Sequence, residues 1–350
     1  MGKQRSMGVT EVITAAETDA PAAYVAAVAR ALPSADFWTM PVLAAVSGGA
    51  DSVSMLLALH RLVPADALGR LLVVHAEHDL RTDAGVDRAF VEGLAGRLGL
   101  RAVIRRLAVV PRRGEGIEAA ARRLRHEFFV DAAAEAGGRH VLVAHTADDQ
   151  AETILHRLLR GTGVAGLAGM SPARELAPGI SLLRPLLAVR RGAARAFLAA
   201  LGADWREDPS NLDRRHARNL VRHDVLAMCE RTRYPACTEA IVRLGRQAAA
   251  AARALRSAAD RLLDDHSRRE ADGSITVRIV GLRGLDPHLV AEVFVALWHR
   301  AGWPQRDMTD RHYTALAALA GREPSPPTAL DLPGGVRAVA DATAVRFTPR

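Results

Sequence analysis

The chain has 350 residues, of which 49% are hydrophobic but only 4% aromatic, and it carries a formal net charge of +8. This length and apolar content suffice for two domains with a sizeable core, and the basic balance favours a polyanionic partner such as nucleic acid. Lys3 is the only lysine, which excludes a Walker-type P-loop and an internal Schiff-base lysine, and which also fits a codon bias towards arginine.

The cysteines and the apolar runs bear on the cell compartment. Cys229 and Cys237 have a spacing that matches neither a disulfide framework nor a metal-binding pair. No apolar run reaches the roughly 18 residues of a membrane span, and residues 1–20 lack the apolar core of a signal peptide. These features predict a cytoplasmic protein without membrane contact, whose translation starts at Met1 or Met7.

Predicted strands and helices alternate over the first two thirds of the chain. Residues 1–38 form an N-terminal tail and a helix (22–32). Residues 39–228 contain apolar segments typical of buried strands, at 42–46, 71–75, 102–107, 140–144 and 182–185. Helical patterns separate them, beginning near 52 and covering 83–98, 117–136, 149–160 and 190–201. This alternation predicts an α/β fold with a doubly wound parallel sheet.

The pattern changes near residue 229. The remaining segments are a long helix (236–268), a strand (275–280), helices at 287–300 and 309–319, and a strand pair after the turn Leu332-Pro333-Gly334-Gly335. Residues 229–350 are therefore expected to form a smaller, mostly helical α+β domain.

The sharpest candidate site follows the first predicted strand and reads Ser47-Gly48-Gly49-Ala50-Asp51-Ser52. Glycine lets the backbone approach an anion without Cβ collisions, and the start of the next helix points free N–H groups at the same place. The hexapeptide therefore predicts a phosphate cradle that needs no lysine. A plain turn with Asp51 or Ser52 as the helix N-cap is the alternative.

The hexapeptide resembles the PP-loop of ATP pyrophosphatases, which split ATP between the α- and β-phosphates and pass AMP to a carbonyl oxygen. Further segments resemble one branch of that superfamily, the tRNA(Ile)-lysidine synthetases, and follow the same order over about residues 40–226. They are 75–81, Glu118 with Arg122 and Arg125, 145–153, 160–167, Arg184-Pro185-Leu186, 205–211 and 218–223.

The resemblance implies a specific reaction. ATP, with Mg²⁺, would adenylate the ring carbonyl of the wobble cytidine in an isoleucine tRNA with a CAU anticodon, and free L-lysine would then displace AMP. The modified base would pair with adenine, which changes both codon and amino-acid specificity. Residues 229–350 would bind tRNA, and the motifs leave the oligomeric state open, a homodimer being one option.

The resemblance also implies roles for individual residues. Asp51, Arg122 and Asp149 would be catalytic, with Asp51 near the Mg²⁺ and Asp149 orienting the substrate amine or the metal. The nucleotide would be bound by Ser47, Gly48, Gly49, Ala50, Asp51, Ser52, His75 and His145. A guanidinium such as that of Arg122 suits bidentate contact with phosphate, although its spacing also fits a solvated helix face. Asp149-x-x-Glu152 also fits a structural capping box.

Basic residues outside the loop are candidates for tRNA phosphate contacts, although each fits a solvated surface arginine equally well. They are Arg157, Arg160, Arg206, Arg218 and Arg222.

Departures from the family pattern occur at Glu77, Asp79 and Thr146. They affect the expected contacts around His75 more than the reaction class. The nearest alternative is a PP-loop tRNA thiolase of the 2-thiocytidine or 2-thiouridine type, but such enzymes generally need cysteine pairs that Cys229 and Cys237 do not form by spacing. A non-catalytic RNA-binding relative is a further alternative.

Overall fold

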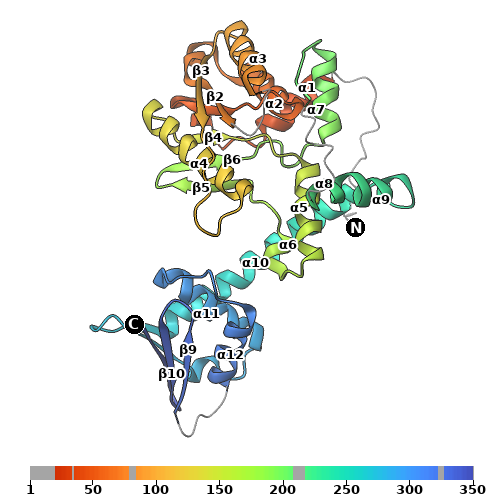
Figure 1. The fold of residues 1–350 in the computed structure, drawn as a ribbon. Coiled ribbons are helices and arrows are strands. Elements are labelled where there is room, and N and C mark those ends of the chain that lie inside the picture. The colour runs from red at the N-terminus through yellow and green to blue at the C-terminus, as the bar shows by residue number, and fades with distance from the viewer. Residues whose placement is uncertain (1–19, 34, 79–83, 208–216, 322–326, 350) are drawn as a thin grey trace, which may run out of the picture. The chain divides into compact units, whose positions relative to one another are not determined.

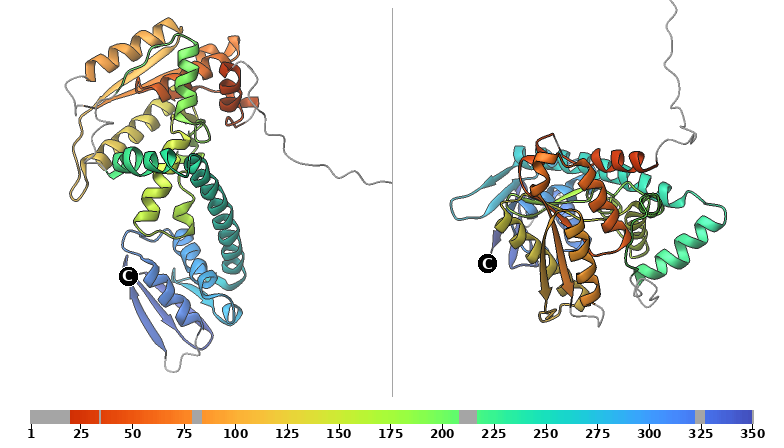
Figure 2. Two further views of the ribbon diagram at one scale, coloured as in Figure 1. Left: turned by 90° about the vertical axis from the view of Figure 1, so that its right-hand side faces the viewer. Right: turned by 90° about the horizontal axis from the view of Figure 1, so that it is seen from above.

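The computed structural model describes residues 20–33, 35–78, 84–207, 217–321 and 327–349, and the chain forms two compact units (Figure 1). The first unit comprises residues up to 162 together with 169–245, and the second comprises 163–168 and 246–350. The boundary between the two units falls within helix α10 (Cys237–His266), the long teal helix of Figure 2, whereas the sequence predicts a boundary after residue 228. The expected tail and the motif segments 79–81 and 208–211 lie outside the described residues.

A six-stranded sheet forms the centre of the first unit, in the order β3-β2-β1-β4-β6-β5. Its strands are β1 (Val42–Ala45), β2 (Leu71–His78), β3 (Arg101–Leu107), β4 (His140–Leu142), β5 (Ala173–Ala177) and β6 (Ile180–Leu183). All neighbours pair in parallel except β5, which runs antiparallel to β6 at the sheet edge. The predicted parallel sheet is confirmed. Strand β5 was not predicted, because a largely exposed edge strand has no buried apolar run.

The central strand β1 is buried on both faces, as its continuous apolar sequence predicts. Val42 and Ala44 belong to the core on one face, and Leu43 belongs to the core on the other with Phe128 and Phe129. Residues from α1 (Ala20–Ala29), α2 (Ala50–Leu62), α3 (Ala84–Arg97) and α7 (Arg191–Ala200) complete the first core, and α4 (Ile117–Ala136) completes the second. Helices therefore cover both faces, which is the doubly wound arrangement.

Another helical group of the first unit packs around Ala151, Val221 and Leu226. It contains α5 (Ala147–Leu159), the π-helix η4 (Val221–Leu226) and the start of α10, with α8 (Ala217–Leu220) and α9 (Ala227–Arg231) on either side of η4. The short 3-10 helices η1 (Ala35–Thr39) and η2 (Ala65–Arg70) lie in the connections beside β1 and β2. A π-helical turn is uncommon and often lies at a functional site.

The strand order determines where a ligand can bind. Strand β1 lies between β2 and β4, so the chain leaves β1 in one direction towards β2 and β3 and later returns on the other side. Ligands of open α/β sheets bind outside the carboxyl ends of the strands at such a switch point. The segments that follow β1 and β4 meet there.

The second unit has a five-stranded antiparallel sheet in the order β7-β8-β11-β10-β9. Its elements are α6 (Val164–Leu167), β7 (Ser267–Arg269), β8 (Ile275–Arg278), η5 (Val280–Leu282), α11 (Pro287–Ala301), α12 (Asp310–Gly321), β9 (Thr328–Leu332), β10 (Val336–Ala340) and β11 (Ala344–Pro349). Phe294 and Trp298 of α11 pack with Phe347 of β11 in its core. The α+β class is confirmed, but β7 and β9 were not predicted. No helix in the described parts of either unit is long and apolar enough to cross a membrane.

Gly138 provides a test of the packing that places β4 beside β1. A Cβ atom added at Gly138 would lie 2.7 Å from the carbonyl oxygen of Pro41 and 2.8 Å from Cδ1 of the buried Leu43. Gly138→Ala should therefore lower the free energy of unfolding by about 1–3 kcal/mol, as other overpacked sites do. Urea unfolding followed by circular dichroism measures the change.

The matched control is Gly96→Ala in α3, where an added Cβ meets open space. This exchange should leave the free energy of unfolding unchanged or raise it by up to about 1 kcal/mol through helix propensity. Equal stability of the two variants would contradict the proposed collision.

Candidate active site

The loop that follows β1 has the geometry of an open anion cradle. Gly48 has a φ of +91°, which side-chain-bearing residues rarely adopt. The hydroxyl of Ser52 accepts a hydrogen bond from the backbone N–H of Ser47 (3.1 Å) and donates one to the carbonyl of Gly49 (2.9 Å). Helix α2 begins at Ala50 with Gly49 as its N-cap, and no side chain caps this helix end. The alternative of an Asp51 or Ser52 N-cap is therefore wrong, and the first N–H groups of α2 remain available to an anion.

The backbone of Arg206 braces this loop. Its N–H donates to the carbonyl of Gly48 (2.9 Å), and its guanidinium donates to Asp87 (3.2 Å). Arg206, whose contact with tRNA stays a prediction, thus supports the loop that follows β1.

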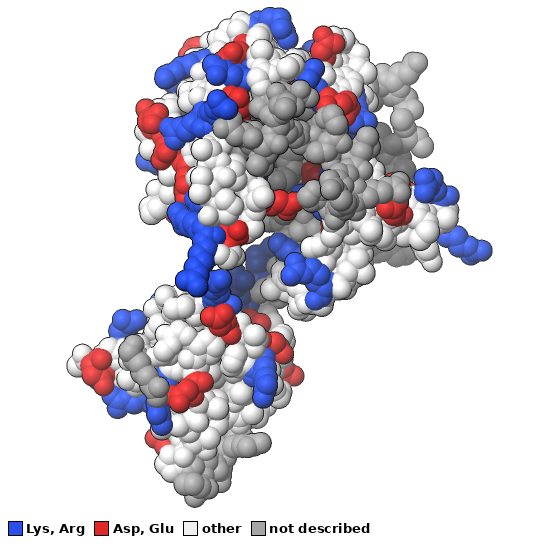
Figure 3. Space-filling model, viewed as in Figure 1, with Lys and Arg blue, Asp and Glu red and all other residues white. Residues whose placement is uncertain are grey.

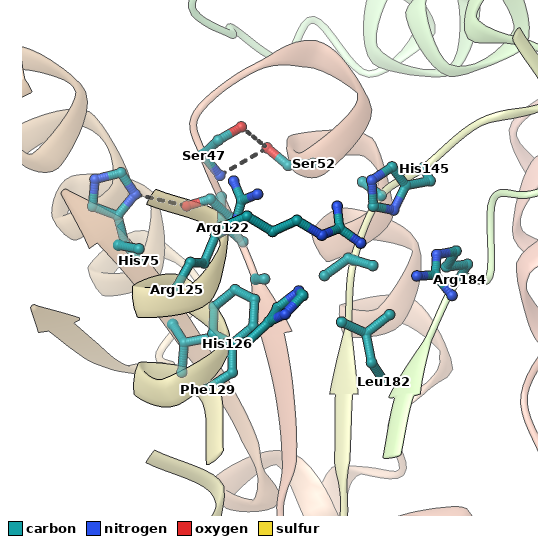
Figure 4. A pocket seen from close by; sticks show the side chains of 16 residues that line it. Ser47, Ser52, His75, Arg122, Arg125, His126, Phe129, His145, Leu182 and Arg184 are labelled. Atoms are coloured by element: carbon teal, nitrogen blue, oxygen red, sulfur yellow. Dashed lines mark hydrogen bonds between the residues drawn. The ribbon is translucent and has the colours of Figure 1, made fainter. Parts of the chain in front are cut away.

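A cavity of about 270 Å³ lies next to the loop, between the ends of the central strands and α4 (Figure 4). Ser47, Ser52 and His75 line one side, and Nδ1 of His75 is hydrogen-bonded to the carbonyl oxygen of Val46 (2.8 Å). The side chain of Arg122, on α4, lies between these groups and His145, which follows β4 (Figure 4). The structure therefore brings together the loop, His75, Arg122 and His145, which are far apart in the sequence.

The cavity is rich in guanidinium groups without acidic partners. Within the described parts of the chain, no carboxylate forms an ion pair with Arg122, Arg125 or Arg184, although Arg184 donates to the carbonyl of Ser171 (2.7 Å) and is 95% buried. Burial, followed by repulsion from Arg174 and Arg122, lowers the pKa of Arg184 to about 10. Such a cluster favours an anionic ligand, because phosphate oxygens would supply the missing negative charge.

Two histidines in this cavity are neutral at pH 7. Burial and the nearby charges of Arg122 and Arg174 lower the pKa of His126 to about 4. Burial also lowers the pKa of His145 to about 4, against the opposing charge of Asp149. The buried Nδ1 of His145 has no hydrogen-bond partner in the part of the chain that the structure describes. Neutral imidazoles can both donate and accept hydrogen bonds, which suits the edge of a nucleobase.

Asp149 caps a helix and also joins an ion-pair network. Thr146 is the N-cap of α5: its hydroxyl accepts from the N–H of Asp149, whose Oδ2 accepts from the N–H of Thr146 (2.8 Å). The capping box is thus real but pairs Thr146 with Asp149, not Asp149 with Glu152. Oδ1 of Asp149 accepts from Arg191 (2.9 Å), Arg218 (3.0 Å) and Arg222 (3.2 Å). Burial alone would raise the pKa of Asp149, but Arg191 and Arg218 outweigh it and lower the pKa.

The same arginines neutralise Glu152, which is 1% exposed. Its carboxylate accepts from Nε of Arg222 (2.6 Å) and Nε of Arg218 (2.9 Å). Both arginines were predicted to contact tRNA. Their roles in RNA binding stay predictions, and the structure adds a pair of acidic partners that the sequence analysis did not include.

Asp51 faces the network from the loop. Its Oδ2 lies 3.3 Å from Nε of Arg191, whereas its Oδ1 is buried and has no hydrogen-bond partner among the described residues. Burial raises the pKa of Asp51 to about 6, although the charge of Arg191 opposes this shift.

The orphaned Oδ1 atom makes Asp51 a suitable ligand for a divalent cation. Among the described residues, no three His, Cys, Asp or Glu side chains are grouped to hold a metal by themselves. Mg²⁺ commonly takes one or two carboxylates and completes its shell with phosphate oxygens and water. The residues present therefore fit Mg²⁺ when a nucleotide is bound beside the loop.

The remaining tRNA candidates lie on α5. Arg157 donates to the carbonyl of Gly169 (2.8 Å), and Arg160 is the exposed C-cap residue. Figure 3 shows basic and acidic side chains interspersed over much of the visible part of the protein. Net charge alone therefore does not locate an RNA-binding surface.

Several site residues were missed as functional candidates. His126 and the guanidinium of Arg184 line the cavity, and Arg191 links Asp51 to Asp149. Arg184 carried a signal, because the Arg184-Pro185-Leu186 segment was part of the family resemblance. Arg191 carried none, since it lies 140 residues from Asp51 in the sequence.

Comparisons with known proteins agree with this geometry. The chain matches the model of a PP-loop domain family over residues 26–229. It is 35% identical to a tRNA(Ile)-lysidine synthase of Rhodopirellula baltica, over 79% of this chain and 78% of that protein. It is 39% identical to a tRNA(Ile)-lysidine synthase of Salinispora tropica, over 85% of this chain and 87% of that protein.

A solved structure is similar in fold. The U34-tRNA thiolase NcsA from Methanococcus maripaludis, which carries a [4Fe-4S] cluster, aligns with a TM-score of 0.54 at 15% sequence identity. The alignment covers 65% of this chain and 79% of that chain. At this identity the similarity concerns the fold alone.

The neutral histidines predict how stability depends on pH. Unfolding returns His126 and His145 from a pKa of about 4 towards 6.5, so between these values the unfolded chain binds more protons. Stability should therefore fall as the pH drops from about 6.5 towards 4. The double variant His126→Gln/His145→Gln should lose less thermal stability than wild type between pH 7 and pH 5, as measured by calorimetry.

The control is His288→Gln, which alters an exposed histidine of α11 outside the cavity. It should keep the pH dependence of the wild type. Parallel pH profiles for the double variant and the wild type would show that the two histidines do not cause the effect.

Proposed function

Since the chain belongs to the tRNA(Ile)-lysidine synthase family of PP-loop proteins, it is a ligase that uses ATP, and we propose that it joins free L-lysine to the wobble cytidine of an isoleucine tRNA with a CAU anticodon. ATP is split to AMP and pyrophosphate, and the reaction passes through an adenylated cytidine. A tRNA substrate is consistent with a cytoplasmic location.

One observation carries this proposal. The residues Ser47 and Ser52, beside the start of α2, line the same cavity as Arg122 and Arg125, which form no ion pair with a carboxylate of the described residues. Such a site can hold a polyphosphate on one side and stabilise negative charge on the other. An adenylation reaction needs both, because charge moves from the attacking oxygen to the departing pyrophosphate.

In the first step, the loop from Ser47 to Ser52 holds the phosphates of ATP. The O2 atom of cytidine attacks the α-phosphorus, the bond to the β-phosphate oxygen breaks, and pyrophosphate leaves. Arg122 neutralises the charge that develops on the transferred phosphoryl group. Neutral His145 and His126 bind the nucleotide by hydrogen bonds without adding repulsion to the cationic cavity. His75, which lies within β2, supports the loop through its hydrogen bond to the carbonyl oxygen of Val46.

In the second step, the ε-amino group of lysine attacks C2 of the activated base and AMP leaves with the former O2 atom. The amine must lose a proton, and a carboxylate near the reaction centre would accept it. Asp149 is our candidate for orienting the amine, because its charge acts on His145, which lines the cavity. Glu152 belongs to the same ion-pair network and adds a second carboxylate beside Asp149.

Mg²⁺ bound with the nucleotide would withdraw charge from the phosphates and make pyrophosphate a better leaving group. Asp51 would hold it through the oxygen that has no other partner. The chain's own contribution is to keep this carboxylate at the start of α2, beside the phosphate cradle.

The alternative that the protein is a tRNA thiolase can be tested by replacing its two cysteines. Cys229 and Cys237 are free, and neither lines the cavity. The double variant Cys229→Ser/Cys237→Ser should therefore retain full lysine incorporation. Loss of activity in a correctly folded double variant would show that a cysteine takes part in the reaction, contrary to this proposal.

The direct test incubates the protein with ATP, Mg²⁺, labelled lysine and a transcript of isoleucine tRNA with the CAU anticodon. We expect label in the RNA and one AMP per lysine incorporated. A transcript with the wobble cytidine replaced by uridine is the control and should remain unlabelled. Absence of label from the first transcript, with tRNA-dependent ATP–pyrophosphate exchange also absent, would favour a non-catalytic RNA-binding protein.

Asp51→Asn and Asp149→Asn should each reduce lysine incorporation by about 100-fold or more, the scale of losing a charged group that acts in a transition state. Binding of tRNA should change little, because neither aspartate is proposed to contact phosphates of the RNA. Filter binding and single-turnover labelling separate the two effects.

Asp66→Asn is the control, since Asp66 is exposed in η2 before β2, at the opposite end of the parallel sheet. It should behave as wild type. Loss of tRNA binding with normal ATP turnover in the Asp51 and Asp149 variants would contradict the assigned roles.

Among the proposed tRNA contacts, Arg160 is the cleanest to test because it is exposed and lies outside the ion-pair network. Arg160→Ala should weaken tRNA binding and reduce the slope of log K against log salt by about one. Arg139→Ala is the control, because Arg139 is exposed at the opposite end of the sheet, before β4. Equal salt slopes for the wild type, Arg160→Ala and Arg139→Ala would show that Arg160 does not contact the RNA.

A further inference from the structure

Arg191 connects the two halves of the candidate active site. It is the first residue of α7, and its guanidinium lies between the PP-loop and α5. Nε is 3.3 Å from Oδ2 of Asp51, Nη2 is 2.9 Å from Oδ1 of Asp149, and Nη1 is 3.6 Å from Glu152. One side chain thus neutralises three carboxylates that come from two different segments.

The bridge is held firmly in place. The backbone N–H of Arg191 donates to Oδ2 of Asp148 (2.7 Å), which ties the start of α7 to the start of α5. Its side chain is only 22% exposed. The planar guanidinium has donors in a fixed fork, so one arginine can meet two carboxylates at once.

Neighbouring cations cannot replace this bridge. Arg190 forms ion pairs with Asp148, Glu230 and Glu239. Arg218 and Arg222 reach Asp149 and Glu152, but no contact joins either of them to Asp51 in the described structure. Arg191 is therefore the only described arginine that contacts both Asp51 and Asp149.

Removal of Arg191 would leave two carboxylates facing each other. Asp51 and Asp149 are close enough to repel, since the charge of Asp149 opposes ionisation of Asp51. Any cation that enters between them, a divalent metal included, must compete with the guanidinium for the negative charge of the same two carboxylates.

We propose that Arg191 is a positioning residue that clamps Asp51 of the PP-loop to Asp149 of α5 and, as a built-in cation, competes with divalent metal ions for these carboxylates. The inference rests on the proposed function in one respect: the clamp aligns the groups that serve adenylation with those that serve the amine. Through the two aspartates, Arg191 sets both the geometry and the cation affinity of the reaction centre without contacting the reacting atoms.

The test uses Mn²⁺ as a paramagnetic divalent probe with the full-length protein, in the absence of ATP and tRNA. The free Mn²⁺ signal in electron paramagnetic resonance gives the dissociation constant. Arg191→Met should bind Mn²⁺ about tenfold more tightly than wild type, because two carboxylates lose their shared counter-charge. Unchanged or weaker Mn²⁺ binding in a folded Arg191→Met protein would overturn the proposal.

Arg195→Met is the matched control. Arg195 lies on the same helix one turn later, and in the described structure it pairs only with the exposed Glu207. This variant should bind Mn²⁺ as wild type does. A similar gain in both variants would mean that general loss of positive charge, and not the clamp, causes the effect, which would overturn the proposal.

If Arg191→Met fails to fold, Arg191→Lys takes its place in the same titration. A lysine ammonium keeps the charge but cannot span both carboxylates, so Mn²⁺ affinity should lie measurably above that of wild type. Equal affinity in Arg191→Lys and wild type would overturn the clamp.

A kinetic measurement separates this inference from the proposed function. In tRNA-dependent ATP–pyrophosphate exchange, Arg191→Met should lower kcat by about tenfold or more with KM for ATP within about twofold, because the phosphate cradle is untouched. An unchanged kcat would overturn the positioning role. If the wild type shows no exchange at all, the proposed function fails, while the Mn²⁺ titration still decides whether the clamp exists.

Discussion

The ion pairs around Asp149 hold the candidate active site together. Its two oxygen atoms have different partners: Oδ2 completes the capping box with Thr146, and Oδ1 accepts from arginines of α7, α8 and η4. A carboxylate buried to this degree would be unstable as an anion without such partners. The same side chain therefore takes part in a capping box and in an ion-pair network, and its role in the reaction stays a prediction.

This network also explains how a chain with a single lysine near its N-terminus can hold a nucleotide. A lysine would supply one flexible positive charge to the phosphates. Here the cradle is made from backbone N–H groups and serine hydroxyls, and the fixed guanidinium groups of Arg122 and Arg125 lie across the cavity. Within the described residues, Arg122 and Arg125 form no ion pair with a carboxylate and suit an anionic ligand, whereas the arginines near Asp149 and Glu152 pair with these carboxylates. Positive charge is thus divided between ligand binding and neutralisation of the protein's own acids.

The departure at Thr146 has a structural consequence. Where the family pattern has a second histidine, this chain has a hydroxyl that caps α5 and donates to Oδ2 of Asp149 (2.9 Å). The threonine therefore holds the capping oxygen of Asp149 and leaves the other oxygen to the arginines. The departure changes how the aspartate is held without removing it from the site.

The sequence by itself determined the parallel sheet, the PP-loop and the family. Buried strands, a glycine-rich turn and ordered motifs are local patterns, and local patterns can be recognised from the sequence alone. It did not predict the edge strand β5, whose residues are mostly exposed. Nor could it show that Arg218 and Arg222 pair with Asp149 and Glu152, since an arginine that binds RNA and one that binds a carboxylate look the same in a sequence.

Only the tertiary structure decided which charges meet. The strand order places the ends of β1 and β4 side by side, and α7 then brings Arg191 to Asp51 across 140 residues of sequence. Electrostatic energy depends on the distance between the charges and on their burial. For residues far apart in the sequence, neither quantity can be inferred from the residue spacing. The turn from Ser47 to Ser52 at the start of a helix was therefore predictable, whereas its link to Asp149 through Arg191 became visible only in the fold.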